Sequence, residues 1–179
     1  SFNSSIEFSL PIRICTLSAG LSSFPKRETS ISFSAVADTV TYLAALSNAP
    51  SGWPVDSRTV STEFNPSADP SISDGRKHYG MDISTQSRII PIYATASGTV
   101  VTAQYHSEFG NYVVIDHGNG FTTLYAHCTD LNVAVGDKVK KGDTIATTGS
   151  TGMSTGVHCH YEIQLNGVYQ NPRDYLGEE

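Results

Sequence analysis

The sequence has few of the features that define disulfide-rich or membrane-spanning proteins. Its 179 residues include three cysteines, an odd number with no C-x-x-C pair, so a disulfide framework is not the basis of the fold. No stretch approaches the ~18 consecutive apolar residues that are needed to cross a bilayer. We therefore expect no membrane partner, and we interpret Cys15, Cys128 and Cys159 as buried free thiols.

Positive charge is also scarce. The formal net charge is −6, and basic residues gather no further than the pairs at 26–27, 76–77 and 140–141. This balance argues against nucleic acid or an anionic membrane as a partner. The chain starts at Ser1 with no basic segment followed by an apolar one, so we take it to be a mature form or a piece of a larger chain.

Histidine is missing from the first fifty residues, which contain only one glycine, Gly20. All six histidines and the other fourteen glycines come later, and APSGWP at 49–54 has the composition of a linker. Alternating apolar and polar residues predict two strands in the first part, and a run that ends before Pro50 can form a short helix. They lie at 5–18, 28–36 and 35–49. We predict a small N-terminal β/α segment of unknown role over 1–50 and a separate domain over 51–179.

The second part is predicted to be mainly β. Four runs of β-branched and aromatic residues are separated by Gly, Asn and Asp: 98–105, 111–117, 121–128 and 157–165. HGNG at 117–120 predicts a type I′ hairpin turn, because Asn-Gly suits the positive φ angles of that turn. Gly-Asp occurs at both 136–137 and 142–143, which predicts two tight turns around one short strand.

Two short motifs have the spacing of metal ligands. In HYGMD, His78 and Asp82 are separated by an even number of residues and share one face of an extended segment, with Gly80 leaving space between them. In HCH, His158 and His160 likewise share a strand face, and Cys159 points to the opposite, core face. Glu162 lies on the histidine side as a candidate outer partner of a ligand. Each motif alone is also compatible with structural histidines.

In combination, the motifs resemble the lysostaphin-type (LytM-like) zinc metalloendopeptidases, which hydrolyse peptidoglycan. HYGMDI, YAH at 125–127 and GVHCHYEI at 156–163 occur in the order and spacing of that family. The similarity spans about residues 52 to 176. It implies an antiparallel β-sheet of the barrel-sandwich, duplicated-hybrid-motif type, and it leaves the first fifty residues unexplained.

The resemblance also implies a role for each site residue. His78, Asp82 and His160 would bind Zn²⁺, while His127 and His158 would face the catalytic water and the substrate carbonyl. Zinc held by three N/O ligands keeps a position for water and lowers the pKa of that water to about 7. The sequence departs from the family where Cys128 and Cys159 replace leucines, and we expect these two thiols to lie close together behind the site.

The resemblance predicts an enzyme that hydrolyses peptide bonds in peptidoglycan cross-links or stem peptides. One alternative is a non-enzymatic peptidoglycan-binding or regulatory domain of the same fold. Another starts from VGDKVKKGD, which resembles lipoyl-type carriers and sugar-transport phosphocarriers, but H-x-G-x-D has no role in either. The expected setting is extracellular, in the cell wall or periplasm, or on a phage tail.

Overall fold

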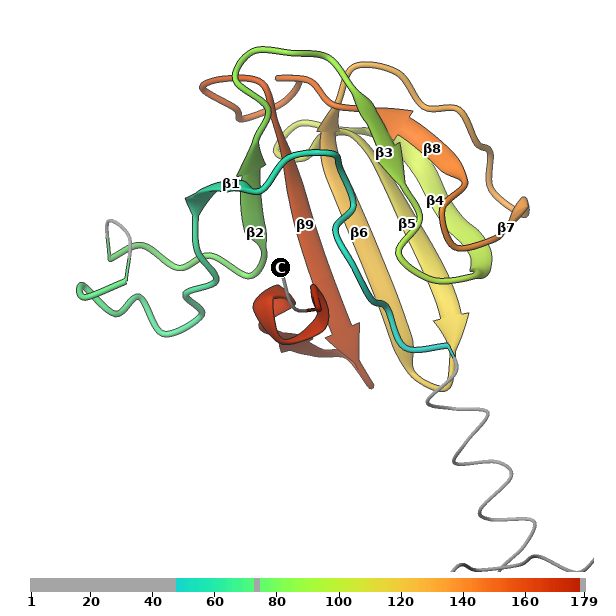
Figure 1. Ribbon diagram of the computed structural model, residues 1–179, viewed down its shortest axis with the longest axis horizontal. Helices are drawn as coiled ribbons and strands as arrows, with labels where there is room; N and C mark the ends of the chain where they lie inside the picture. Colours follow the sequence, from blue (N-terminus) through green and yellow to red (C-terminus); the bar gives the residue numbers. More distant parts are fainter. Residues whose placement is uncertain (1–47, 73–74, 178–179) are drawn as a thin grey trace, which may run out of the picture. The chain divides into compact units, whose positions relative to one another are not determined.

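The computed structural model describes residues 48–72 and 75–177 (Figure 1). Its main feature is an open antiparallel sheet in the order β1-β2-β9-β6-β5-β4-β7, with β10 also paired to β9. These strands are β1 (Thr59–Thr62), β2 (Met81–Ser84), β4 (Gly98–His106), β5 (Gly110–Gly118), β6 (Phe121–Cys128), β7 (Lys138–Val139), β9 (His158–Leu165) and β10 (Val168–Gln170). A 3-10 helix, η1 (Pro172–Tyr175), follows β10. The mainly β, antiparallel prediction is confirmed, and the sheet does not close into a barrel.

A second layer covers one face of this sheet. β3 (Pro91–Tyr93) pairs with β8 (Thr144–Thr147) as a separate two-stranded ribbon, seen in front of the large sheet in Figure 1. Ile92 from β3 and Ile145 from β8 are fully buried in the same apolar cluster as Tyr125 and Tyr161 of the large sheet. Burial of large apolar and aromatic side chains is the main favourable term in folding, so packing against this layer fixes the position of β6 and β9.

The turns follow the sequence patterns. Gly118 pairs with Phe121, and the two residues between them, Asn119 and Gly120, have φ of 52° and 83°, as a type I′ turn requires. β7 lies between two turns in which the carboxylates of Asp137 and Asp143 accept hydrogen bonds from backbone N–H groups. Both predicted turn regions are confirmed.

The thiols are also where we expected them. Cys128 and Cys159 are free, fully buried and part of the core. Burial raises the pKa of Cys159 well above its usual value, and the nearby Cys128 thiol raises it further when it is ionised. Cys15 lies outside the described residues.

His117 begins a chain of hydrogen bonds through the core. Its Nδ1 donates to the carbonyl of Ser97 at 3.0 Å, and its Nε2 lies 2.7 Å from Oγ1 of Thr123. The chain continues through the hydroxyls of Tyr125, Thr95 and Tyr161. Each buried polar atom of these side chains therefore has a partner, and His117 has a structural role in the core.

The proposed N-terminal segment lies mostly outside the described residues. Its predicted strands and helix fall within 1–47 or depend on it, and the boundary at residue 50 stays a prediction. Within the described ranges, no helix has the length and apolar character of a membrane span.

Candidate metal centre and active site

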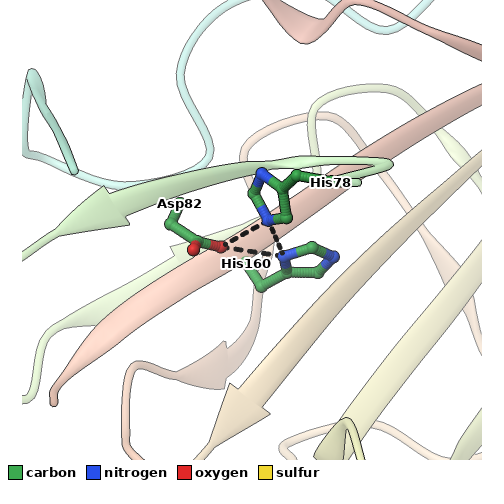
Figure 2. Close-up of side chains that lie close together, drawn as sticks. All are labelled: His78, Asp82 and His160. Carbon is green, nitrogen blue, oxygen red and sulfur yellow. Dashed lines mark hydrogen bonds and ion pairs between the residues drawn. The ribbon is translucent and has the colours of Figure 1, made fainter. Parts of the chain in front are cut away.

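Strand pairing brings three predicted ligands together. β2 and β9 are antiparallel neighbours, and Asp82 is directly opposite His160 in their register. His78 lies four residues before Asp82, and its backbone is held by a two-way hydrogen-bonded bridge to Asn65. The three side chains point toward one another on the same side of the sheet (Figure 2). Asp82 and His160 belong to paired strands, whereas a bend at Tyr79 and Gly80 separates His78 from β2.

The donor atoms lie at the distances expected around one cation. Oδ1 of Asp82 is 2.8 Å from Nδ1 of His160 and 3.2 Å from Nε2 of His78, and the two nitrogens are 3.1 Å apart (Figure 2). A tetrahedral zinc site with bonds of about 2.1 Å separates its ligand atoms by about 3.4 Å. The observed triangle is slightly tighter and can accommodate a metal ion with little movement.

Neighbouring groups fix which nitrogen of each imidazole faces this triangle. Nδ1 of His78 lies 2.9 Å from the carbonyl oxygen of Glu63, which can only accept a hydrogen bond, so the proton is on Nδ1. Nε2 of His160 lies 3.1 Å from Oε1 of Glu162, a buried residue that is only 4% exposed. When both rings are neutral, their inner nitrogens present lone pairs to one point, beside the carboxylate of Asp82. This is the arrangement of metal-binding histidines with outer partners.

The electrostatics of the triangle favour a positive charge. Burial opposes charge on His160, but its hydrogen bonds to Asp82 and Glu162 outweigh that cost and raise its pKa to about 9. Burial would raise the pKa of Asp82, whereas hydrogen bonds from His160 and His78 lower it below the usual range of a carboxyl group. A proton or a metal ion between these three side chains would therefore interact favourably with the same nitrogen and oxygen atoms.

Gly80 gives the H-x-G-x-D motif its compactness. A Cβ at this position would lie 2.6 Å from the carbonyl oxygen of Tyr161 and 2.8 Å from Cε1 of His160. It would also contact Cγ of Glu162 at 2.9 Å. The absence of a side chain thus lets the segment between two candidate ligands lie directly against the third.

A β-bulge places His127 beside the triangle. Val113 of β5 is opposite Tyr125, but Asn111 is opposite Cys128, so β6 has one extra residue here. His127 has a φ of 60°, and this left-handed backbone breaks the alternation that would turn its side chain toward the core. Tyr125 and Cys128 consequently both face the core, whereas His127 lines the cleft.

The loop between β8 and β9 orients both remaining histidines. Nδ1 of His127 donates to the carbonyl of Thr151 at 2.9 Å, and Nδ1 of His158 donates to the carbonyl of Gly156 at 2.8 Å. Their ring centroids are 4.7 Å apart, and Nε2 of His158 is 3.6 Å from Oδ1 of Asp82. Burial lowers the pKa of His127 to about 4, so its ring is neutral near pH 7 with Nε2 able to accept a proton.

These side chains line a cleft of about 360 Å³. Its other lining residues are Thr62, Arg76, Lys77, Glu108, Phe109, Met153, Ser154 and Thr155. Sequence reasoning missed Phe109 and the loop carbonyls of Thr151 and Gly156. The stretch GSTGMSTG at 149–156, rich in Gly, Ser and Thr and next to HCH, is the sequence signal for this loop. His106 is exposed at the end of β4, outside the cleft.

A family model decides the relationship. The model of peptidase family M23 matches residues 76–172, more than half of the chain, and this range contains all four site histidines and Asp82. The chain belongs to peptidase family M23. Membership in a peptidase family speaks against the lipoyl-carrier and phosphocarrier interpretations.

Individual M23 relatives agree. The chain is 41% identical over 121 residues to a peptidoglycan DD-endopeptidase, ShyC of Vibrio cholerae, covering 67% of this chain and 28% of ShyC. A zinc-containing peptidase structure from Vibrio cholerae has a TM-score of 0.63 at 33% identity, covering 73% of this chain and 40% of that one. The catalytic domain of lysostaphin from Staphylococcus simulans has a TM-score of 0.57 at 31% identity, covering 66% and 91%. The chain thus spans less than a third of the length of ShyC.

Proposed function

We propose that this M23 domain is a zinc-dependent endopeptidase that hydrolyses peptide bonds in peptidoglycan cross-links or stem peptides. His78, Asp82 and His160 would hold the ion. The observation that carries the proposal is the convergence of three donor atoms within 3.2 Å of one another, flanked by two further imidazoles in one cleft. The substrate class comes from relatives such as ShyC, whose name specifies a peptidoglycan DD-endopeptidase.

The donor set suits zinc. Two neutral imidazoles and one carboxylate are common ligands of catalytic zinc, and they leave a fourth position toward the cleft. When bound, zinc polarises a carbonyl group and makes water acidic enough to lose a proton near pH 7. The protein supplies the alignment of the ligands, through the hydrogen bonds from His78 to Glu63 and from His160 to Glu162.

The other two histidines carry the proton chemistry. Because the Nδ1 atoms of His127 and His158 are held by loop carbonyls, their Nε2 atoms are left to act on substrate and water. In this geometry they orient the attacking water, accept its proton and donate a hydrogen bond to the oxyanion once protonated. No covalent enzyme intermediate is required, and both buried thiols lie on the core side.

Because the proposed substrate is peptidoglycan, we propose that the domain acts in the cell wall or periplasm. The relatives are much longer than this chain, so we propose that the domain acts as part of a larger protein. The phage-tail setting remains a prediction from the sequence.

Digestion of purified peptidoglycan tests the proposal. Sacculi with different cross-links are incubated with the chain, with and without a chelator, and the fragments are analysed by mass spectrometry. We expect new amino and carboxyl ends that disappear with chelator and return with added zinc. The variant Asp82→Asn should be inactive, and Asp130→Asn, an exposed position outside the cleft, should cleave like the parent. Binding to sacculi without any cleavage by the zinc-loaded parent would support the non-enzymatic alternative instead.

A further inference from the structure

The cleft has an uneven distribution of charge. In the sheet order, β1 and β2 lie on one side of β9, and β6, β5 and β4 lie on the other. Arg76 and Lys77, in the segment that leads into β2, contribute two neighbouring cations to the first side of the cleft. This is notable in a chain whose net charge is −6.

The other side of the cleft is acidic and apolar. It consists of Glu108 and Phe109 at the β4–β5 turn together with Met153 in the loop before β9. The backbone N–H of Met153 donates to the carbonyl of Glu108 at 2.8 Å, which ties the turn to the loop. Gly110 packs against Thr151 so closely that an added Cβ would lie 2.2 Å from Oγ1 of Thr151. The two segments therefore form one wall, which differs in charge from the side of Lys77.

Lys77 is well placed to recognise a substrate group. It directly precedes the candidate ligand His78 in the sequence, and its exposed side chain lines the cleft. Among residues 48–72 and 75–177, it forms no ion pair with a carboxylate. Several other cations of the domain are engaged elsewhere: Arg58 lies over the ring of Trp53, and Lys141 donates to Ser51.

We propose that Lys77 makes the cleft selective for cross-links in which a residue next to the scissile bond carries a free carboxylate. The inference rests on the proposed function. The anionic groups of a peptide are carboxylates, and an ammonium group one residue from a metal ligand reaches the residues that flank the bond to be cut. A carboxylate gains a charge-assisted hydrogen bond at this position, and a neutral carboxamide gains only a weaker one. Because Lys77 is exposed, we expect a preference of about fivefold, near the upper limit for an exposed ion pair.

The test uses two cross-linked peptide dimers that differ only at this group, one with the free carboxylate and one with the carboxamide. Values of kcat/KM are measured by chromatography for the zinc-loaded parent chain, Lys77→Gln and Lys140→Gln. Lys140 is an exposed lysine in the turn after β7, outside the cleft, and serves as the matched control. We expect a carboxylate-to-amide ratio of about 5 for the parent and for Lys140→Gln, and about 1 for Lys77→Gln. Lys77→Glu should invert the preference, and added salt should reduce the ratio of the parent.

The outcomes separate the inference from the function on which it rests. A parent ratio of 1, or an unchanged ratio in Lys77→Gln, overturns the selectivity and leaves the endopeptidase proposal intact. If neither dimer is cleaved, the proposed function fails, and the binding of the two intact dimers, measured by calorimetry, decides the inference. Tighter binding of the carboxylate dimer that is lost in Lys77→Gln supports it, and equal affinities overturn it.

Discussion

Asp82 and His160 are directly opposite each other in the register of two neighbouring strands, with Oδ1 and Nδ1 2.8 Å apart. A backbone ladder therefore sets the distance between two candidate ligands before any metal binds. Both strands are anchored by core residues on the opposite face, including Ile83 and Tyr161, which are fully buried. Such preorganisation of ligands on strands gives a site more precision than ligands on loops would have.

We expect Glu162→Gln to weaken zinc binding by about 10-fold to 100-fold, the usual effect of removing an outer partner of a ligand. The buried carboxylate accepts a hydrogen bond from Nε2 of His160 and so increases the basicity of the inner nitrogen. Competition with a chromophoric chelator measures the affinity. Asp130→Asn, which removes an exposed carboxylate outside the cleft, is the control and should bind zinc like the parent. Equal affinities of parent and Glu162→Gln would show that Glu162 only fills space.

His127→Ala should separate catalysis from metal binding. We expect kcat on a cross-linked peptide to fall by a factor of about 10² to 10⁴, the usual contribution of a general acid or base. Zinc content should stay at that of the parent, because His127 is not one of the three converging donors. His106→Ala, at the exposed end of β4, should keep both properties. Loss of zinc from His127→Ala would contradict the division of roles.

Two glycine substitutions test the packing of the H-x-G-x-D motif. Gly80→Ala forces a methyl group against the carbonyl of Tyr161 and the ring of His160, and we expect it to reduce the free energy of unfolding by about 1–3 kcal/mol. Zinc affinity should fall as well. Gly156→Ala meets nothing within 4 Å and serves as the control. Denaturant unfolding in the presence of chelator measures the unfolding free energy of both variants. Equal stability of Gly80→Ala and Gly156→Ala would refute the steric argument.

His117 predicts part of the pH dependence of stability. Burial lowers its pKa in the folded state, so below its unfolded pKa of about 6.5 the unfolded chain binds the proton more strongly. The neutral ring thus contributes stability above pH 6.5 that is lost as the pH falls. We expect the parent to lose more unfolding free energy between pH 7.5 and 5.5 than His117→Gln, measured with chelator in both samples. Parallel curves for parent and variant would contradict this account.

Much of the site could be predicted from local patterns. Alternation identified β4, β5, β6 and β9, and Asn119-Gly120 located the turn that sets the register of β5 with β6. Even spacing within HCH was sufficient to place its two histidines on a common face. These features depend on residues close together in the sequence, so the sequence contains their signal.

The rest depends on contacts between distant segments. His127 faces the cleft only because β6 has an extra residue relative to β5, and a regular strand would have turned it toward the core. The carbonyls of Thr151 and Gly156, which orient the two histidines, have no side-chain signature. The pairing of β3 with β8 joins strands about fifty residues apart, and each is too short for its pattern to specify a partner.

Anomalous diffraction at the zinc absorption edge, on crystals grown with equimolar zinc, tests the central claim most directly. We predict a single strong peak within about 2.0–2.2 Å of Nε2 of His78, Oδ1 of Asp82 and Nδ1 of His160. His127 and His158 should lie nearby without binding the ion. A peak held by other side chains, or no peak between β2 and β9, would contradict the account.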